Sequence, residues 1–309
     1  MSPKRKQPDP VVQDGIKYWS SQPASYDGVL GGWIWDWVPP AHRVSRIAPV
    51  PHASDAELCT VPSAIRPLNA KPPTRRIRAL DVGAGIGRVT ADTLLHLVDD
   101  AALVEPVDAL VQEAYARGTA SMNPPAAPAE DTPAQDNDAD DAEHGQEPPP
   151  RPWKGIADKS KSVSFFQATL QEVDPASLST SAKYLGRVGY TPDPPDADAD
   201  SGFDVVWCQW CLMYMGDEDL VAFLRRAKKA LRTPEEGRKP SVIVVKENVA
   251  AELEYGKAAV VWDEEDSSVT RSDLAWKAIF KEAGLQLFHQ QVQKGLPEGL
   301  FTVKMYALK

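Results

Sequence analysis

Apolar residues recur along this chain at two spacings, one typical of strands and one typical of helices. Continuous apolar runs of strand length lie at 77–83, 101–105, 162–168, 203–209, 241–247, 285–291 and 301–309. Segments with apolar residues at helical spacing lie at 87–97, 107–117, 217–231 and 271–283. Because strands and helices alternate, we expect an α/β fold with a doubly wound, mostly parallel sheet. The last two runs are separated by KGLPEGL and predict a terminal hairpin, which would add an antiparallel strand.

The segments outside this pattern predict insertions within one domain. The chain has 309 residues, a length that a single α/β domain with insertions can fill, and we take 1–309 as that domain. Composition predicts a disordered tail at 1–10, a helix with a Gly-rich lid loop at 11–38, a Pro-rich insertion at 39–75, an acidic disordered insertion at 118–155 and an acidic, Pro-rich loop at 186–202.

Charge, hydropathy and cysteine content identify no partner but indicate a compartment. Residues 130–147 carry eight acids and no Lys or Arg, so the rest of the chain has a net charge of −10 minus −8, or −2. A nearly neutral body gives no sign of nucleic-acid binding. No apolar stretch is long enough to span a membrane, and the first residues lack a signal-peptide pattern. Three cysteines cannot form a disulfide framework, so we expect the cytoplasm or the nucleus.

A glycine-rich turn follows the first predicted strand, in ALDVGAGIGRVT, residues 79–90. Glycines at 83, 85 and 87 let the backbone adopt positive φ and approach a ligand, and the following helix supplies free N–H groups. The third glycine comes one residue earlier than in the dinucleotide fingerprint G-x-G-x-x-G, which favours a ligand without a pyrophosphate. Glu105, at the end of the next strand, could accept both hydroxyls of a ribose. These features suit S-adenosylmethionine. A ligand-free tight turn and a nucleotide dehydrogenase are the alternatives.

A second motif, WCQWC, is a C-x-x-C pair that follows the strand at 203–209. This pattern is compatible with a thioredoxin-like redox site. A zinc site would need two further ligands, and the five histidines are scattered, so we expect no metal. The redox alternative leaves the glycine turn unexplained. We therefore expect Cys208 and Cys211 to be small buried residues beside a ligand pocket.

Six blocks together carry a resemblance to a known family: YWSSQPASYDGVLGGW, DVGAGIGRVT, WCQWCLMYMGDEDLVAFLRRAKKAL, VIVVKENVA, DEEDSSVTRS and GLPEGLFTVKMYALK. The chain resembles the eukaryotic protein N-terminal (α-N) methyltransferases, which modify chains that begin X-Pro-Lys or X-Pro-Arg. The glycine turn is generic to class I methyltransferases, whereas the D-G-x-L-G-G and D-x-x-D-S-S-V-x-R blocks are specific. The resemblance implies a Rossmann-like class I fold, with a seven-stranded, mostly parallel sheet and an N-terminal helical extension.

The resemblance also implies which residues bind S-adenosylmethionine. Gly83, Gly85 and Arg88 would hold its methionine part, and Arg88 would pair with the carboxylate. Glu105 stands where the family usually has Asp and would bind the ribose. The remaining cofactor contacts implied are Leu170 and Gln171 at the adenine, Gln209 at the cofactor end, and Leu30 of the lid loop, which would touch both ligands.

On the peptide side, the resemblance matches chemistry to what an X-Pro-Lys terminus needs. Trp19 and Trp210 would form flat apolar walls for the proline ring, and Asn248 would donate to the first carbonyl. Asp263 and Ser268 would bind the third-position Lys or Arg, and Asp266 would lie near the α-amine. The alternatives are that DEEDSSV is a solvated acidic turn that caps the helix at 271, and that each Trp is a core residue.

Two departures from the family affect the expected mechanism. The α-amine has a pKa of about 7.7–8.0 and must lose its proton before it attacks, so a carboxylate or a relay helps. Tyr214 stands where the family often has His, and Phe301 where it has Tyr, so we assign Asp266 as the base and Tyr214 as a relay or orienting group. A binding protein that kept the fold but lost activity is the alternative. The chain's own Ser2-Pro3-Lys4 matches the substrate pattern and is a candidate partner once Met1 is removed.

Overall fold

The computed structural model describes residues 8–29, 75–124, 151–235, 240–296 and 299–309. At the centre is a ten-stranded sheet in the order β4-β3-β2-β1-β5-β6-β10-β9, with β8 paired to β6 and β7 paired to β8. The strands are β1 (Arg78–Val82), β2 (Asp100–Val104), β3 (Ser162–Gln167), β4 (Lys183–Gly189), β5 (Val205–Gln209), β6 (Val242–Ala250), β7 (Val260–Asp263), β8 (Ser268–Ser272), β9 (Leu287–Val292) and β10 (Thr302–Leu308).

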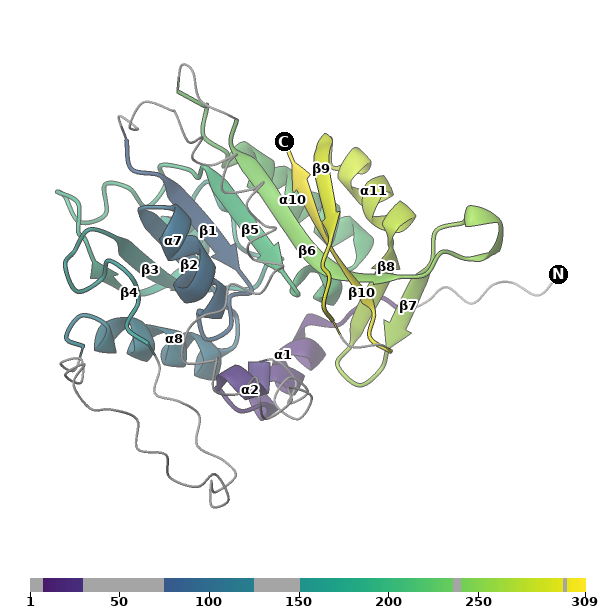
Figure 1. Ribbon diagram of the computed structural model, residues 1–309, viewed down its shortest axis with the longest axis horizontal. Coiled ribbons are helices and arrows are strands. Elements are labelled where there is room, and N and C mark those ends of the chain that lie inside the picture. Colours follow the sequence, from purple (N-terminus) through teal and green to yellow (C-terminus); the bar gives the residue numbers. More distant parts are fainter. Residues whose placement is uncertain (1–7, 30–74, 125–150, 236–239, 297–298) are drawn as a thin grey trace, which may run out of the picture.

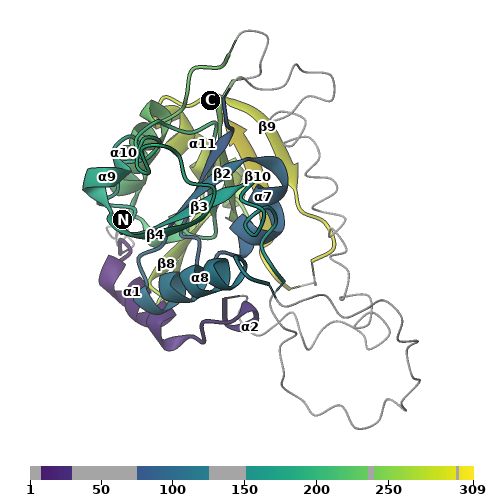
Figure 2. The ribbon, with the colours of Figure 1, turned by 90° about the vertical axis from the view of Figure 1, so that its left-hand side faces the viewer.

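Helices cover both faces of the sheet, which explains the continuous apolar runs of the central strands. The helical elements are α1 (Val12–Ser21), α2 (Tyr26–Val29), η2 (Thr90–Leu94), α7 (Leu95–Leu97), α8 (Asp108–Ala120), α9 (Leu178–Ser181), η3 (Leu212–Tyr214), α10 (Asp217–Lys229), η4 (Glu254–Gly256) and α11 (Asp273–Glu282). Residues of α9, α10 and α11 share one buried cluster with the sheet, and residues of η2, α7 and α8 pack on the opposite face. Figure 2 shows these two layers on either side of the strands.

All seven predicted apolar runs form strands, and β1, β2, β3, β5 and β6 are parallel as expected. The predicted terminal hairpin is also present, because β10 pairs antiparallel with both β9 and β6. The three additional strands are β4, β7 and β8. They escaped prediction because β4 is a partly exposed edge strand rich in Gly and charge, while β7 and β8 form a short hairpin within an acidic block.

Several predicted boundaries differ from the structure. The helix predicted at 87–97 begins with the π-helical turn η2, and the helix predicted from 271 begins at Asp273 because the preceding residues complete β8. The acidic insertion predicted at 118–155 starts inside α8, and near its end Trp153 is buried against Gly87. Residues 125–150 of that insertion, and 30–74, lie outside the described residues.

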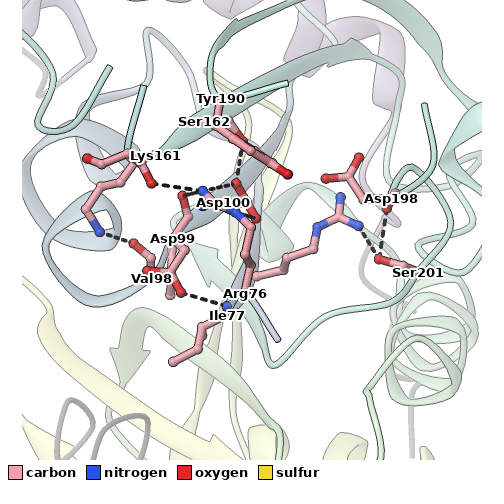
Figure 3. A network of polar contacts seen from close by, with 12 residues as sticks. Arg76, Ile77, Val98, Asp99, Asp100, Lys161, Ser162, Tyr190, Asp198 and Ser201 are labelled. Carbon is pink, nitrogen blue, oxygen red and sulfur yellow. Dashed lines mark hydrogen bonds and ion pairs between the residues drawn. The ribbon is translucent and has the colours of Figure 1, made fainter. Parts of the chain in front are cut away.

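The loop predicted at 186–202 is likewise not a solvated low-complexity segment throughout. Its first residues belong to β4, and Asp198 forms an ion pair with Arg187, whose guanidinium also donates to Ser162. These residues belong to a polar network at the edge of the sheet where the parallel strands begin (Figure 3). In the same network, Arg76 donates to Asp100 at 2.7 and 2.8 Å. The network fastens this loop to the starts of β1, β2 and β3.

The opposite edge, where β1 and β5 end, is covered by α1 and α2 (Figure 1). Ile16 and Trp19 of α1, with Tyr26 and Val29 of α2, pack on a small apolar cluster centred on Ile86 of the glycine turn. The N-terminal segment therefore lies against the turn that the sequence singles out. No helix in the described part of the chain is long and apolar enough to cross a membrane.

Candidate functional site

The glycine turn after β1 has the conformation that its sequence predicts. Gly83 and Gly85 adopt φ of +60° and +56°, values that favour glycine. A Cβ atom at Gly83 would lie 2.3 Å from the Cβ of Cys211, so the turn packs directly against the residues that follow β5. A Cβ at Gly85 would meet only Val29, at 3.7 Å. The turn is thus closed on its Gly83 side and open above Gly85, which suits a small ligand.

Glu105 lies beside this turn and is buried. Its two carboxylate oxygens accept the N–H groups of Gly85 at 2.8 Å and Val107 at 2.9 Å. Burial raises the pKa of this carboxyl to about 7, although both hydrogen bonds lower it. A carboxylate has about four lone-pair sites, so two remain for the hydroxyls of a ribose. The remaining acceptor sites of Glu105 and the open glycine turn therefore fit the ribose and the methionine part of S-adenosylmethionine.

Asp81, the single acid of β1, lies buried beneath the glycine turn. Its carboxylate accepts a hydrogen bond from Thr90 at 2.7 Å, and burial raises its pKa to about 7. Arg88 is half-buried, and its positive charge lowers the pKa of Asp81 against that effect of burial. The positive charge of Arg88 therefore acts on the buried end of β1, from which the glycine turn begins.

The other predicted cofactor residues lie along the same edge of the sheet. Arg226 of α10 donates to the carbonyls of Leu170 and Gln171 at 2.8 and 3.0 Å and so fixes the loop after β3. Gln209 ends β5 and accepts a hydrogen bond from Trp207 at 3.2 Å. Leu30 lies outside the described residues.

The DEEDSSV block forms the tip of the β7–β8 hairpin. Asp263 and Ser268 are directly opposite each other in the antiparallel register, with Asp263 exposed and Ser268 buried. The helix cap that was the alternative role of this block is provided instead by Ser272, whose hydroxyl accepts the N–H of Ala275 at 3.4 Å. The tip is therefore free of a capping role, and its Asp and Ser are adjacent.

Asp266, at the same tip, forms a hydrogen-bonded pair with Tyr214. The Tyr214 hydroxyl donates to Asp266 Oδ2 at 2.8 Å, while Asp266 Oδ1 is buried without a hydrogen-bond partner among the described residues. Burial and the charge of Asp266 raise the pKa of Tyr214 well above its usual value. Tyr214 therefore stays protonated and acts as a donor. The ring of Trp19 meets that of Tyr214 edge-on, with centroids 6.4 Å apart.

Trp210 and Asn248 complete the peptide side. Trp210 follows β5 with φ +53°, its N–H donates to the Lys246 carbonyl at 3.1 Å, and its indole Nε1 is buried with no partner within the described segments. Asn248 is half-buried on β6, opposite Val303 of β10. Trp19 and Trp210 are both half-buried, unlike Trp207 and Trp276, which are core residues. Phe301 is exposed, just before β10.

The C-x-x-C pair is unsuited to redox chemistry. Cys208 and Cys211 are buried free thiols, and burial raises both pKa values well above the usual range. A reactive cysteine needs an accessible thiolate, which neither residue provides. Cys211 instead packs on Gly83, as expected for a small buried residue beside a pocket. Within the described ranges, no group of three His, Cys, Asp or Glu side chains could hold a metal ion.

Two buried charges near the site were not singled out by the sequence. Glu247, fully buried on β6, accepts the N–H groups of Cys211 and Leu212, and burial raises its pKa to about 7. Arg271 of β8 is also buried and donates to the Met215 carbonyl at 2.7 Å. The one available signal was their position, since Glu247 precedes Asn248 and Arg271 ends the D-x-x-D-S-S-V-x-R block.

Comparison with known proteins agrees with this geometry. The profile of the family described as AdoMet dependent proline di-methyltransferase matches residues 7–125 and 156–309. "Alpha N-terminal protein methyltransferase 1" of Arabidopsis thaliana is 31% identical over 96% of this chain and 78% of its own length. The Schizosaccharomyces pombe protein of the same name is 29% identical over 97% of each chain. The rat "N-terminal Xaa-Pro-Lys N-methyltransferase 1" is 25% identical over 94% of this chain and 92% of its own.

A solved structure supports the same conclusion. An S-adenosylmethionine-dependent methyltransferase of Leishmania major matches 96% of this chain and 82% of its own, with 25% identity and a TM-score of 0.56. The comparisons confirm the resemblance, the class I Rossmann-like fold and S-adenosylmethionine as the methyl donor, and they argue against a dehydrogenase. This chain belongs to the AdoMet-dependent proline di-methyltransferase family and is an S-adenosylmethionine-dependent methyltransferase.

Proposed function

We propose that the protein methylates the free α-amino group of proteins whose processed N-terminus reads X-Pro-Lys or X-Pro-Arg. The observation that carries the proposal is the arrangement at the β7–β8 tip. One buried oxygen of Asp266 lacks a partner among the described residues, beside an adjacent Asp263 and Ser268 pair. This oxygen of Asp266 is suited to bind an amine, and the Asp263 and Ser268 pair is suited to bind a Lys or Arg side chain. The name of the rat relative supports an Xaa-Pro-Lys terminus, and the name of the plant relative supports methylation at the N-terminus.

The cofactor would lie on the glycine turn, held by Gly83, Gly85, Arg88, Glu105, Leu170, Gln171 and Gln209, and would supply the methyl group. The chain's own residues then bind and orient the peptide. In this proposal Trp19 and Trp210 flank the proline ring, and the Asn248 amide donates to the first carbonyl. Leu30 stays a proposed contact of both ligands, outside the described residues.

Asp266 is the proposed proton acceptor. A free α-amine is partly neutral at pH 7–8, so its attack on the methyl group depends mainly on position and on removal of one proton. The Tyr214 hydroxyl holds Asp266 Oδ2, which leaves Oδ1 for the amine. Tyr214 thus orients the base and keeps its own proton. We propose the cytoplasm and the nucleus as the location, since reduced thiols persist there.

A peptide panel tests the proposal. Ser-Pro-Lys-Arg peptides, the same peptides with an acetylated N-terminus, and Ser-Gln-Lys-Arg peptides are incubated with the protein and S-adenosylmethionine. Mass spectrometry with fragmentation then locates each methyl group. We expect methylation of the α-amine of the first peptide alone. Equal labelling of the acetylated peptide, or labelling on a lysine side chain, would contradict the proposal. No transfer despite measurable cofactor binding would favour the alternative, a binding protein that kept the fold.

The chain's own Ser2-Pro3-Lys4 lies outside the described residues, and its use as a substrate stays a prediction. Among the first described residues after this terminus, the N–H of Val11 donates to the Ser267 hydroxyl at 3.0 Å, next to Asp266. Protein prepared with Ser2 as its first residue can be incubated with S-adenosylmethionine and analysed by intact mass. A Pro3→Gln variant is the control. An unmodified Ser2 amine alongside efficient methylation of added peptide would exclude self-methylation.

A further inference from the structure

The turn that follows β5 touches both halves of the site. This turn comprises Trp210–Met215. Its Cys211 packs on the glycine turn at Gly83, and its Tyr214 donates a hydrogen bond to Asp266. Any shift of this turn would therefore move a wall of the cofactor side and the partner of the proposed base together. Residues that fix the position of this turn should therefore affect binding of both the cofactor and the peptide.

Glu247 holds the start of the turn. One carboxylate oxygen, Oε1, accepts the N–H groups of Cys211 at 3.0 Å and Leu212 at 2.9 Å. These two groups directly follow Trp210, whose φ of +53° is uncommon for a bulky residue. A charged acceptor makes stronger hydrogen bonds than a neutral one and helps to hold such a backbone. The other oxygen, Oε2, is buried without a partner in the described part of the chain.

Arg271 holds the end of the same turn. Its guanidinium donates to the Met215 carbonyl at 2.7 Å and to Asp217, the first residue of α10, at 2.7 and 3.0 Å. Its Nη1 lies 3.5 Å from the Leu212 carbonyl. Arg271 is paired with Val249 across β6 and β8, two residues beyond Glu247. One buried anion therefore binds the N–H groups of the turn, and one buried cation binds its carbonyls.

We propose that Glu247 and Arg271 are positioning residues that act through the Trp210–Met215 turn, and that they align the cofactor turn and the Tyr214–Asp266 pair as one unit. This inference rests on the proposed function for its peptide side. Neither residue touches the reacting atoms, so both act through others. Replacing either should disturb cofactor binding and transfer together, which a residue that only stabilises the fold would not do selectively.

Charge at Glu247 gives the inference a second readout. The charged or titratable groups that interact with it are Arg271, the thiols of Cys208 and Cys211, and the hydroxyls of Tyr214 and Tyr306. Burial raises the pKa of each of these thiols and hydroxyls, so they stay protonated and uncharged at neutral pH. Below pH 7 Glu247 gains a proton and then resembles glutamine, with one acceptor oxygen and one buried donor.

Glu247→Gln is the first test, with Glu252→Gln as its matched control. Glu252 also accepts one backbone N–H, from Leu274, and also has a buried oxygen without a partner among the described residues, but it has no contact with the turn. At pH 8 we expect Glu247→Gln to lower kcat/KM for a Ser-Pro-Lys-Arg peptide about tenfold and to weaken S-adenosylhomocysteine binding several-fold. The kinetic ratio to wild type should approach one at pH 6. Glu252→Gln should stay within about twofold of wild type at both pH values.

A double-mutant cycle with Tyr214→Phe separates positioning from general stability. If Glu247 acts through the turn, its substitution should lower kcat less in the Tyr214→Phe background than in wild type. Independent, multiplying effects would overturn the inference, as would equal behaviour of Glu247→Gln and Glu252→Gln. If Glu247→Gln does not fold, Arg271→Lys tests the same turn from its other end with the same expected losses. If wild type does not methylate the peptide at all, the proposed function fails, and the affinities of the variants for S-adenosylhomocysteine still decide the inference.

Discussion

Buried charged groups have opposite surroundings at the two ends of the parallel strands, which we call the amino-terminal and the carboxyl-terminal edges of the sheet. Where the parallel strands begin, carboxylates form ion pairs with guanidinium groups: Asp100 with Arg76 (Figure 3), and Asp198 with Arg187. Burial alone would raise the pKa of Asp198, but hydrogen bonds from Arg187 and the charge of Arg78 hold it below its usual range. Where the strands end, burial raises the pKa values of Asp81, Glu105 and Glu247 to about 7.

Among the described residues, buried polar atoms without a hydrogen-bond partner are more numerous where the parallel strands end than where they begin. At the carboxyl-terminal edge, Glu247 Oε2, Asp266 Oδ1 and Trp210 Nε1 are buried without hydrogen-bond partners among the described residues. At the amino-terminal edge, the corresponding atom is Arg78 Nε, in a side chain whose Nη1 donates to Ser201. Raised pKa values and unsatisfied polar atoms cluster at functional sites, whereas closed ion-pair networks serve the fold. The contrast assigns ligand binding to one edge and stability to the other.

The largest expected effect comes from placing a charge on the peptide side. Asn248→Lys should abolish methyl transfer, because the new cation is half-buried and repels the incoming ammonium group. Binding of S-adenosylhomocysteine, measured by calorimetry, should persist. A loss of cofactor affinity as severe as the loss of activity would mean that Asn248 does not belong to the peptide side.

The free energy of unfolding should depend on pH in opposite directions for the carboxyls at the two edges. Carboxyls with a folded pKa near 7 bind protons in the folded state that the unfolded chain has already lost, so the free energy of unfolding falls as pH rises from about 4.5 to 7. Each such group lowers the free energy of unfolding by about 3 kcal/mol as the pH rises through that window. Asp198 acts in the opposite sense, because its stabilisation is present above its unfolded pKa, about 4, and is lost as pH falls further.

Urea unfolding between pH 3 and pH 8 measures both contributions. Glu247→Gln should flatten the fall in stability between pH 4.5 and 7, and Asp198→Asn should reduce the loss of stability below pH 4. Identical pH slopes for wild type and Glu247→Gln would contradict a raised pKa of the Glu247 carboxyl in the folded protein.

The smallest effect is expected from removing residues 125–150 with a short linker in their place. This segment is rich in Asp, Glu, Pro and Ala and offers few apolar side chains to bury, and long loops add little closure entropy. Peptide turnover and thermal stability should change little. The deletion must stop short of Trp153, which packs on Gly87, and of Ser121, whose hydroxyl accepts the Trp153 N–H at 2.9 Å. A Trp153→Ala control should lower stability strongly.

Pattern and motif predicted the parts of the molecule that depend on local sequence. The strands that lead to Gly83, Glu105 and Gln209 are continuous apolar runs, and the glycine turn carries its conformation in its residues. The family blocks supplied the peptide side, which no periodicity could indicate. The site residues themselves stay predictions, now with the positions described above.

What the sequence could not supply depends on contacts between distant segments. In the sequence, Glu247 is only the polar end of a predicted strand. Its hydrogen-bond partners, the N–H groups of Cys211 and Leu212, are more than thirty residues earlier in the chain. The Tyr214–Asp266 pair spans 52 residues. The strand β4 has no apolar run because it lies at the edge of the sheet, where its side chains are partly exposed.

One matched pair of variants tests the division between the two edges most directly. Asp266→Asn and Asp100→Asn each remove one carboxylate charge, and kcat/KM for a Ser-Pro-Lys-Arg peptide and the free energy of unfolding are measured for both. We predict that Asp266→Asn lowers kcat/KM by about 10²–10⁴-fold with little change in stability. Asp100→Asn should lower stability by about 3 kcal/mol, with kcat/KM of the folded protein unchanged. Retained transfer by Asp266→Asn, or equal kinetic losses in both variants, would contradict the assignment of catalysis to the carboxyl-terminal edge.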